Sequence, residues 1–372
     1  MSDAEKRWGK LAKRYASKLR EKGWRRLIAD TRGRSNIAAG ARRLAHKAAR
    51  LLGHLGVRGG GVTMRTLPWT AACRDQAMQR GPHPSAQGEC EFVSEEMLDF
   101  CMQGYWIVLP YAVVQEWQNL RISPLGVVPQ RDRRPRLIVD YSFSGVNADT
   151  IAMAPKEAMQ FGRTLQRVLS TTVYADCRYG PVNLSKIDIA DGFYRVWLQV
   201  ADIPKLGVAF PTHPNSPLLV AFPLALPMEW IESPPYFTSL TETACDLANT
   251  ALAARPPPSH LITTHRLEAV ADTPPIDVAP CQAVDHNRAR VVTSKRTPVA
   301  AVDVYVDDFI LMAQTLAQRQ RVLRATLGAI DDVFRPLSAD DPPGSQITRV
   351  REENAKGGRA LVHLEAHPGV GH

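Results

Sequence analysis

Short apolar runs separated by polar segments predict a protein that mixes strands and helices. Three runs rich in β-branched and aromatic residues indicate strands at Trp106–Pro110, Leu125–Val128 and Leu137–Tyr141. An arginine-rich segment separates the last two runs, which predicts a hairpin. Helices are indicated at Ser94–Gly104, where a serine and two glutamates suit a helix start, and at Leu316–Phe334, where apolar residues recur at helical spacing. This pattern predicts an α+β fold.

Two further apolar runs carry carboxylates. The run Val302–Met312 contains the adjacent pair Asp307 and Asp308, and Asp-Asp suits a tight turn between two strands. The run Leu184–Val196 places Asp188 between two isoleucines. Carboxylates in apolar surroundings are costly unless something binds them, and a divalent cation is a natural partner. We therefore expect Asp188 and Asp307 to meet around metal, although they are 119 positions apart in the sequence.

Simpler interpretations stay open for each carboxylate. Asp307 and Asp308 could form a solvated acidic turn that binds nothing. Asp188 could form a salt bridge with Lys186, which lies two residues away on the same strand face, or with Arg195. The metal interpretation is favoured because carboxylates from two strands can hold two cations about 3.5–4 Å apart, which clamps the attacking and leaving oxygens of a phosphoryl transfer.

Four segments, taken in chain order, resemble the sequence boxes of reverse transcriptases. Ser123–Gln130 and Arg134–Tyr141 resemble the fingers of the family, and this resemblance ends at Asn147. Lys186-Ile187-Asp188, followed by Phe193, resembles the first catalytic box, and Leu226–Phe237 resembles the second, Pro-x-Gly-x-x-x-Ser-Pro-x-x-Phe. Tyr305-Val306-Asp307-Asp308 resembles the Tyr-x-Asp-Asp box. The resemblance covers about residues 92–335 and is nearer to gypsy-like retrotransposons than to retroviruses. It implies a fingers hairpin and a palm of antiparallel strands backed by helices.

The resemblance implies roles for the matching residues. Asp188, Asp307 and Asp308 would be the catalytic carboxylates that bind Mg²⁺ or Mn²⁺, with Asp307 a more direct ligand than Asp308. Arg136 would contact the incoming triphosphate, because a guanidinium fork matches phosphate oxygens. Phe193 would crowd a ribose 2′-hydroxyl and so favour deoxynucleotides.

Further roles follow from the same resemblance. A second nucleotide-binding cation would come from Arg131, Arg133 or Arg134, with Arg133 taken as the candidate. Four residues would lie near the template-primer: Pro227, Glu229, Trp230 and Tyr305. The implied activity is that of an RNA-directed DNA polymerase, in which a primer 3′-hydroxyl attacks the α-phosphate of a deoxynucleoside triphosphate and pyrophosphate leaves. RNA or DNA template-primer would be the partner.

One departure from the family pattern affects the expected activity. Glu229 stands where the second box has glycine. A side chain there can clash with the template-primer, and a carboxylate repels phosphate. One alternative is therefore an inactive relic of the fold that only binds nucleic acid. Another is a metal-dependent nuclease, which shares the paired carboxylates but needs neither the nucleotide gate nor the fingers arginines.

The pattern along the chain also predicts its organisation. A proline-rich stretch without apolar periodicity indicates a disordered insertion at 252–299. The last residues are polar and rich in glycine, so we expect a truncated protein without thumb, ribonuclease H or integrase. The expected parts are a basic helical extension at 1–58, a linker at 59–91, fingers and palm at 92–335, and a polar tail at 336–372.

Charge adds one expectation to this picture. The net charge is +9, but residues 1–60 alone carry 17 Lys and Arg against 4 Asp and Glu. Such basic helices can bind a phosphate backbone or an anionic membrane surface, act as a transit peptide, or simply be solvated. There is no apolar run of membrane-spanning length and no secretory signal, and six cysteines are scattered without pairing motifs. We therefore expect an intracellular protein, cytoplasmic or nuclear, that is neither secreted nor membrane-bound.

Overall fold

The computed structural model describes residues 3–32, 61–131, 133–152, 161–189, 191–212, 216–254 and 297–334. These residues form two compact units. The first contains the described residues up to 152 together with those from 193 to 234, and the second contains those from 161 to 192 and from 235 onward. Strands and helices occur in both units, which confirms the expected α+β class.

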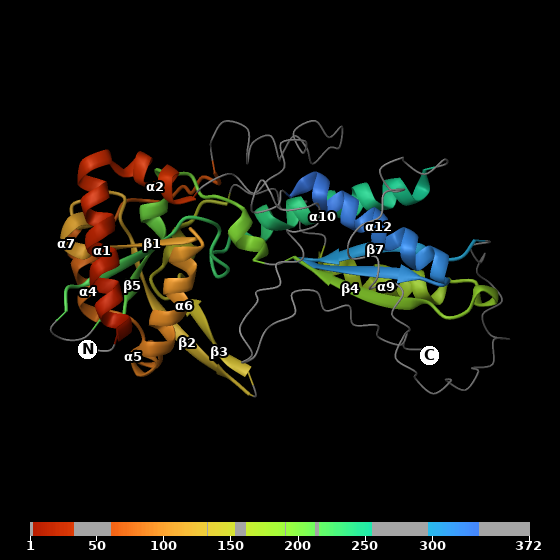
Figure 1. Ribbon diagram of the computed structural model, residues 1–372, viewed down its shortest axis with the longest axis horizontal. Helices are drawn as coiled ribbons and strands as arrows, with labels where there is room; N and C mark the ends of the chain where they lie inside the picture. The colour runs from red at the N-terminus through yellow and green to blue at the C-terminus, as the bar shows by residue number, and fades with distance from the viewer. Residues whose placement is uncertain are drawn as a thin grey trace. The chain divides into compact units, whose positions relative to one another are not determined.

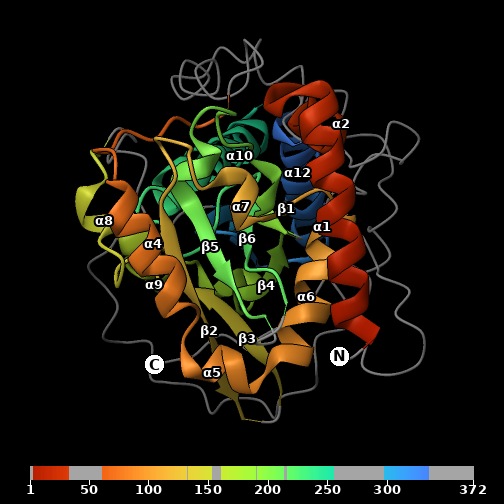
Figure 2. The same cartoon turned by 90° about the vertical axis from the view of Figure 1, so that its left-hand side faces the viewer.

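The first unit is built on a five-stranded sheet, which can be seen in Figure 2. Its strands are β1 (Trp106–Pro110), β2 (Ile122–Gln130), β3 (Arg133–Val139), β5 (Gly207–Phe210) and β6 (Leu219–Pro223), in the order β1-β6-β5-β2-β3. The predicted strand at Trp106–Pro110 is confirmed. The predicted hairpin is also confirmed, because β2 and β3 pair antiparallel with Leu125 opposite Val139.

Helices and 3-10 turns complete the described part of this unit. They are α1 (Asp3–Lys22), α2 (Trp24–Arg32), α4 (Ala71–Arg80), α5 (Pro84–Gly88), α6 (Cys90–Met102), α7 (Tyr111–Val114) and α8 (Val146–Asp149), with 3-10 turns η5 (Gly192–Arg195) and η6 (Ile203–Leu206). Of these helices, α1, α4, α5, α6 and α7 contact the sheet. The prediction that a helix begins at Ser94 is wrong by one turn. Ser94 lies inside α6, which already begins at Cys90, and it is buried together with Val93 and Met97.

The basic N-terminal helix α1 is part of the core of this unit. Trp8, Ala12, Tyr15 and Ala16 are buried. The Trp8 ring packs 4.8 Å from that of Phe210, and its indole nitrogen donates a hydrogen bond to the Ser94 carbonyl. Figure 2 shows α1 running beside α6 at the edge of the sheet. The helical spacing of the aromatic residues is therefore a packing pattern, and this part of the expected extension folds against the sheet.

In the segment expected to be a linker, 59–91, the described residues from 61 onward belong to the first unit. It contains α4 and α5, and it buries Val62 and Met64. Val62 forms an isolated parallel bridge with Leu198, and the Met64 backbone nitrogen donates to the Asp202 carboxylate. Single bridges of this kind leave no periodic pattern in the sequence, which explains why the pattern indicated a linker.

The second unit is built on a three-stranded antiparallel sheet. Its strands are β4 (Asn183–Asp188), β7 (Ala300–Tyr305) and β8 (Asp308–Ala313), in the order β4-β8-β7. Its helices are α9 (Thr164–Val173), α10 (Ser233–Ala253) and α12 (Leu316–Val333), with 3-10 turns η3 (Phe161–Arg163) and η4 (Cys177–Tyr179). The helix α12, drawn in blue over β7 and β8 in Figure 1, confirms the predicted helix to within one residue.

Alternation along these strands gives the second sheet two different faces. One face carries Ile187, Val302, Val304, Phe309 and Leu311, all of which are buried. The helix α12 packs against β7 and β8 and contributes its own buried apolar residues. The register places the acidic residues of the three strands on the opposite face. The carboxylates share that face with Met312, which belongs to a second buried apolar cluster with Val168 of α9.

Several predicted parts fall largely or wholly outside the described residues. They are the second half of the basic extension, most of the insertion at 252–299, and the tail at 336–372. The helix α10 continues through Ala253, so the first residues of the expected insertion are helical. Among the described helices, none combines the length and apolar character that crossing a membrane requires.

Candidate metal centre

Three aspartates of the second unit meet at one end of its sheet. Asp188, the last residue of β4, pairs directly with Asp308, the first residue of β8. Asp307 lies in the turn between β7 and β8. One carboxylate oxygen from each residue lies within 4.8 Å of the other two. The expected meeting of Asp188 and Asp307 is therefore confirmed, and the strand register explains it.

The electrostatics of the three aspartates suit a cation. Asp188 Oδ1 is buried and receives no hydrogen bond from the part of the chain that the structure describes. Burial, followed by the charges of Asp307 and Asp308, raises the pKa of Asp188 to about 7. Burial and then Asp308 also raise the pKa of Asp307. A divalent ion would satisfy the unpaired oxygen and relieve the repulsion among the carboxylates, so this donor set fits Mg²⁺ or Mn²⁺.

Among the described residues, Lys186 forms an ion pair with this cluster. Its ammonium group lies 2.8 Å from Asp308 Oδ1, so Lys186 pairs with Asp308 and not with Asp188. Burial lowers the pKa of Lys186, but the hydrogen bond to Asp308 and the nearby carboxylates raise it by more. A metal ion would thus compete with Lys186 for Asp308, whereas Asp188 Oδ1 has no such competitor among the described residues.

The predicted triphosphate-binding residue lies in the first unit. Arg136 is in β3, the strand that begins at Arg133, and its side chain is 51% exposed. Its guanidinium Nη2 lies 3.6 Å from Glu229 Oε1 and also contacts the Met228 sulfur. Burial raises the pKa of Glu229, and Arg136 offsets part of this rise. Glu229, which departs from the family pattern, is therefore the ion-pair partner of Arg136, which is expected to bind the nucleotide.

The loop that carries Glu229 is held by Asn147. The Asn147 amide donates to the Glu229 carbonyl at 3.1 Å and accepts from the Ile231 backbone nitrogen at 3.0 Å. Trp230 is fully buried, and its indole nitrogen donates to the Thr150 hydroxyl. Asn147, at the end of the fingers resemblance, is thus a positioning residue that sequence reasoning marked only as a boundary.

The remaining predicted residues differ in their accessibility. Pro227 and Trp230 are buried, and no surface of Trp230 is exposed. Tyr305 is 51% exposed at the end of β7. Phe193 is half-buried in η5. Arg134 forms a 3.0 Å ion pair with Glu96 in α6, so it is already paired within the first unit.

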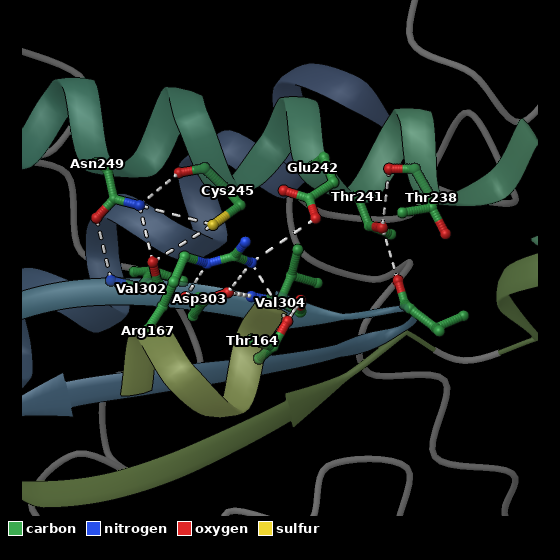
Figure 3. Close-up of polar contacts among 11 residues, drawn as sticks. Thr164, Arg167, Thr238, Thr241, Glu242, Cys245, Asn249, Val302, Asp303 and Val304 are labelled. Carbon is green, nitrogen blue, oxygen red and sulfur yellow. Dashed lines mark hydrogen bonds and ion pairs between the residues drawn. The ribbon is translucent and has the colours of Figure 1, made fainter. Parts of the chain in front are cut away.

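Sequence reasoning missed a polar network along β7, shown in Figure 3. The Arg167 guanidinium of α9 forms two hydrogen bonds with the Asp303 carboxylate, one of them 2.6 Å long. The Thr164 hydroxyl donates to the Val304 carbonyl. From α10, the Asn249 amide both donates to and accepts from the Val302 backbone. The signal in the sequence was Asp303, a charged residue inside an apolar strand.

Comparison with known proteins adds two findings. No family model and no curated protein sequence matches the chain. Among solved structures, the native protease-reverse transcriptase of prototype foamy virus is similar to it with a TM-score of 0.37 and 15% identity, covering 75% of this chain and 26% of that chain. A CSH mutant of that viral protein gives 0.36 and 16%, covering 74% and 24%. The chain therefore spans about a quarter of the length of these proteins. Similarity at this level does not by itself assign the fold.

Proposed function

We propose that the chain is the fingers and palm of a reverse transcriptase from a gypsy-like retroelement, and that it performs RNA-directed DNA synthesis. The observation that carries this proposal is the convergence of Asp188, Asp307 and Asp308. Sequence boxes that resemble a polymerase family marked these three residues. Their converging carboxylates, one with an unsatisfied buried oxygen, fit a cation of the kind that assists phosphoryl transfer.

Each of the candidate site residues would have a defined role in this reaction. Asp188 and Asp307 would hold Mg²⁺ or Mn²⁺, with Asp308 shared between metal and Lys186. When bound, the metal neutralises charge on the transferred phosphoryl group and on the attacking and leaving oxygens. Arg136 would orient the triphosphate of the incoming deoxynucleotide, and Phe193 would exclude the ribose 2′-hydroxyl. RNA or DNA template-primer would be the macromolecular partner.

One observation favours a second candidate function. Arg136 is already paired with Glu229, and Glu229 adds a negative charge at a position expected near the template-primer. An inactive relic that keeps the fold and binds nucleic acid would tolerate both features. The two candidates differ in a single property, which is whether the metal centre extends a primer.

Primer extension on poly(rA)/oligo(dT), with Mg²⁺ or Mn²⁺, tests the proposal. The wild-type chain should extend the primer, and Asp307→Asn should abolish extension. Asp246→Asn provides the matched control, because Asp246 is exposed on α10 of the same unit and lies outside the carboxylate cluster.

Other outcomes of this assay are equally informative. Loss of labelled template without extension would support a metal-dependent nuclease. A folded wild-type chain that binds Mn²⁺ yet extends nothing would contradict the polymerase proposal and support the relic.

A further inference from the structure

The turn that carries Asp307 has an uncommon backbone conformation. Val306 has a φ of 59°, in the left-handed region that β-branched residues rarely occupy. Such a conformation persists only where the surrounding structure holds it. Because Val306 directly precedes Asp307, its conformation determines the direction in which the Asp307 carboxylate leaves the turn.

A threonine of α10 contacts this strained residue. The Thr241 hydroxyl donates a 2.6 Å hydrogen bond to the Val306 carbonyl. Figure 3 labels Thr241 on α10. The same hydroxyl lies 3.3 Å from the Thr238 carbonyl of its own helix. A hydroxyl has one proton to donate, and the shorter distance favours Val306. Thr241 is fully buried, so water does not compete for this carbonyl from the side of the helix.

The rest of α10 fixes the position from which Thr241 acts. Asn249 pairs with both backbone groups of Val302 on β7. Eight residues of helix separate Asn249 from Thr241, a rise of about 12 Å. Four residues of strand separate Val302 from Val306, a rise of about 13 Å. The helix and the strand are therefore matched in length between their two points of contact, and the first contact sets the location of the second.

We propose that Thr241 is a positioning residue of the metal centre. Its hydroxyl holds Val306 in the left-handed conformation, which directs Asp307 toward Asp188 and Asp308. This inference rests on the metal site of the proposed function and does not depend on polymerase activity. Thr241 itself touches neither metal nor substrate, so the relevant readout is metal affinity.

Another threonine of the same helix provides a matched control. Thr243 is also fully buried, and its hydroxyl donates to the Ser239 carbonyl within α10. Thr243→Val and Thr241→Val make the same chemical change at two buried sites one-half turn apart. Only Thr241→Val removes a hydrogen bond from the Asp307 turn.

The experiment measures Mn²⁺ binding to the full chain by electron paramagnetic resonance, with the melting temperature of each variant as a folding check. Thr241→Val should weaken Mn²⁺ binding by about fivefold to tenfold, the loss expected for one buried hydrogen bond. Thr241→Ser keeps the hydroxyl and should stay within about twofold of wild type. Thr243→Val should leave the affinity unchanged, and Asp307→Asn should abolish binding.

A second variant guards against misfolding of Thr241→Val. Val306→Gly adopts the left-handed conformation without steric cost, so it should reduce the dependence on the threonine. In the Val306→Gly background, Thr241→Ala should cost clearly less Mn²⁺ affinity than it does in the wild-type background. An equal cost in both backgrounds would contradict the proposal.

The remaining outcomes separate this inference from the proposed function. If the wild type binds Mn²⁺ and Thr241→Val binds it equally well, the positioning role is overturned while the metal centre stands. An equal loss in Thr243→Val would show that any buried change in α10 has the same effect, which also overturns it. If the wild type binds no Mn²⁺, both the positioning role and the metal centre of the proposed function fail.

Discussion

Asp188 lies between Ile187 and Ile189, both of them buried, and one of its carboxylate oxygens receives no hydrogen bond from any residue that the structure describes. Two more carboxylates lie within 4.8 Å of it. In the metal-free chain this arrangement costs free energy, because like charges repel and the buried oxygen is unsatisfied. A residue retained at such a cost is typical of a ligand site rather than of a structural one.

The first prediction concerns Asp188→Asn, which removes one charge with little change of shape. In the presence of EDTA the free energy of unfolding should rise by about 1–2 kcal/mol, since the repulsion with Asp307 and Asp308 is relieved. Mn²⁺ should no longer stabilise the variant. Denaturant titrations of wild type and variant, each with EDTA and with Mn²⁺, measure both effects. A variant that is less stable than wild type in EDTA would show that Asp188 is held by a structural partner.

The second prediction concerns Glu242 on α10. Burial is the main cause that raises its pKa from 4.5 to about 7, and Asp303 and Asp246 add to this while Arg167, 3.9 Å away, lowers it. A carboxyl whose pKa is raised by folding contributes stability that is complete below about pH 4.5 and is lost as the pH rises through 7. Glu242→Gln should remove this loss. Its advantage over wild type in unfolding free energy should therefore grow by about 1–3 kcal/mol between pH 5 and pH 8.

Urea titrations at several pH values measure this difference. The exposed Glu91→Gln, on α6 of the first unit, is the control. A constant difference between Glu242→Gln and wild type across this range would mean that the Glu242 carboxyl stays ionised in the fold.

At the scale of elements, the sequence predicted strands and helices where apolar residues set a clear period. The strand Trp106–Pro110 and the helix α12 follow directly from such patterns. The start of α6 could not be predicted, because Ser94 suits a helix N-terminus by chemistry but is buried within the helix by its neighbours. A local capping preference is worth about 1 kcal/mol, and tertiary burial exceeds it.

In the candidate site, too, some features could be predicted from the sequence and others could not. The three aspartates could be predicted from their charge in apolar strands. The hydrogen bond from Thr241 to Val306 could not, because it joins a helix to a turn 65 residues later and involves a backbone carbonyl, which any residue carries. Likewise, the burial of Trp8 and Tyr15 could not be separated from a nucleic-acid-binding role by spacing alone.

The third prediction concerns the exposed face of α1. Because its aromatic residues are buried in the first unit, deleting the helix would disturb the fold, so substitutions of surface cations are the better test. Lys10, Lys13 and Arg14 are exposed. Replacing all three with glutamine should weaken binding to nonspecific nucleic acid and reduce the slope of log affinity against log salt by about 2.

Filter binding at several salt concentrations measures this slope. The melting temperature should not change, since the three side chains are solvated. An unchanged slope in a folded variant would show that α1 does not contact phosphate.

At the scale of the whole molecule, the parts expected of a polymerase are distributed over two units. The second unit contains the carboxylate cluster, whereas the first contains Arg136 and Glu229. Synthesis would require both. The first unit departs from the family pattern at Glu229, and the structure adds that Glu229 is 3.6 Å from the Arg136 guanidinium. A triphosphate would have to displace this carboxylate before Arg136 could bind it.

The last prediction follows from that competition. Glu229→Gln removes the charge and should tighten the binding of a deoxynucleoside triphosphate by about twofold to fivefold, the value of a partly exposed ion pair. Glu229→Gly also removes the side chain, so it should give at least the same gain and, in addition, tighter binding of template-primer. Both gains in nucleotide affinity should vanish in combination with Arg136→Ala.

Calorimetric titration of dTTP into each folded variant measures the affinities, and primer extension is followed in parallel. Asp307→Asn in the Glu229→Gly background should leave the nucleotide gain partly in place while it abolishes extension, because the two residues act in different units. Weaker nucleotide binding by Glu229→Gln would mean that Glu229 does not compete with the triphosphate but instead orients Arg136 to bind it. If the wild-type chain extends nothing, and Glu229→Gly binds nucleotide and metal more tightly but also extends nothing, the absence of extension cannot be assigned to Glu229. The inactive relic would then be the better description of this chain.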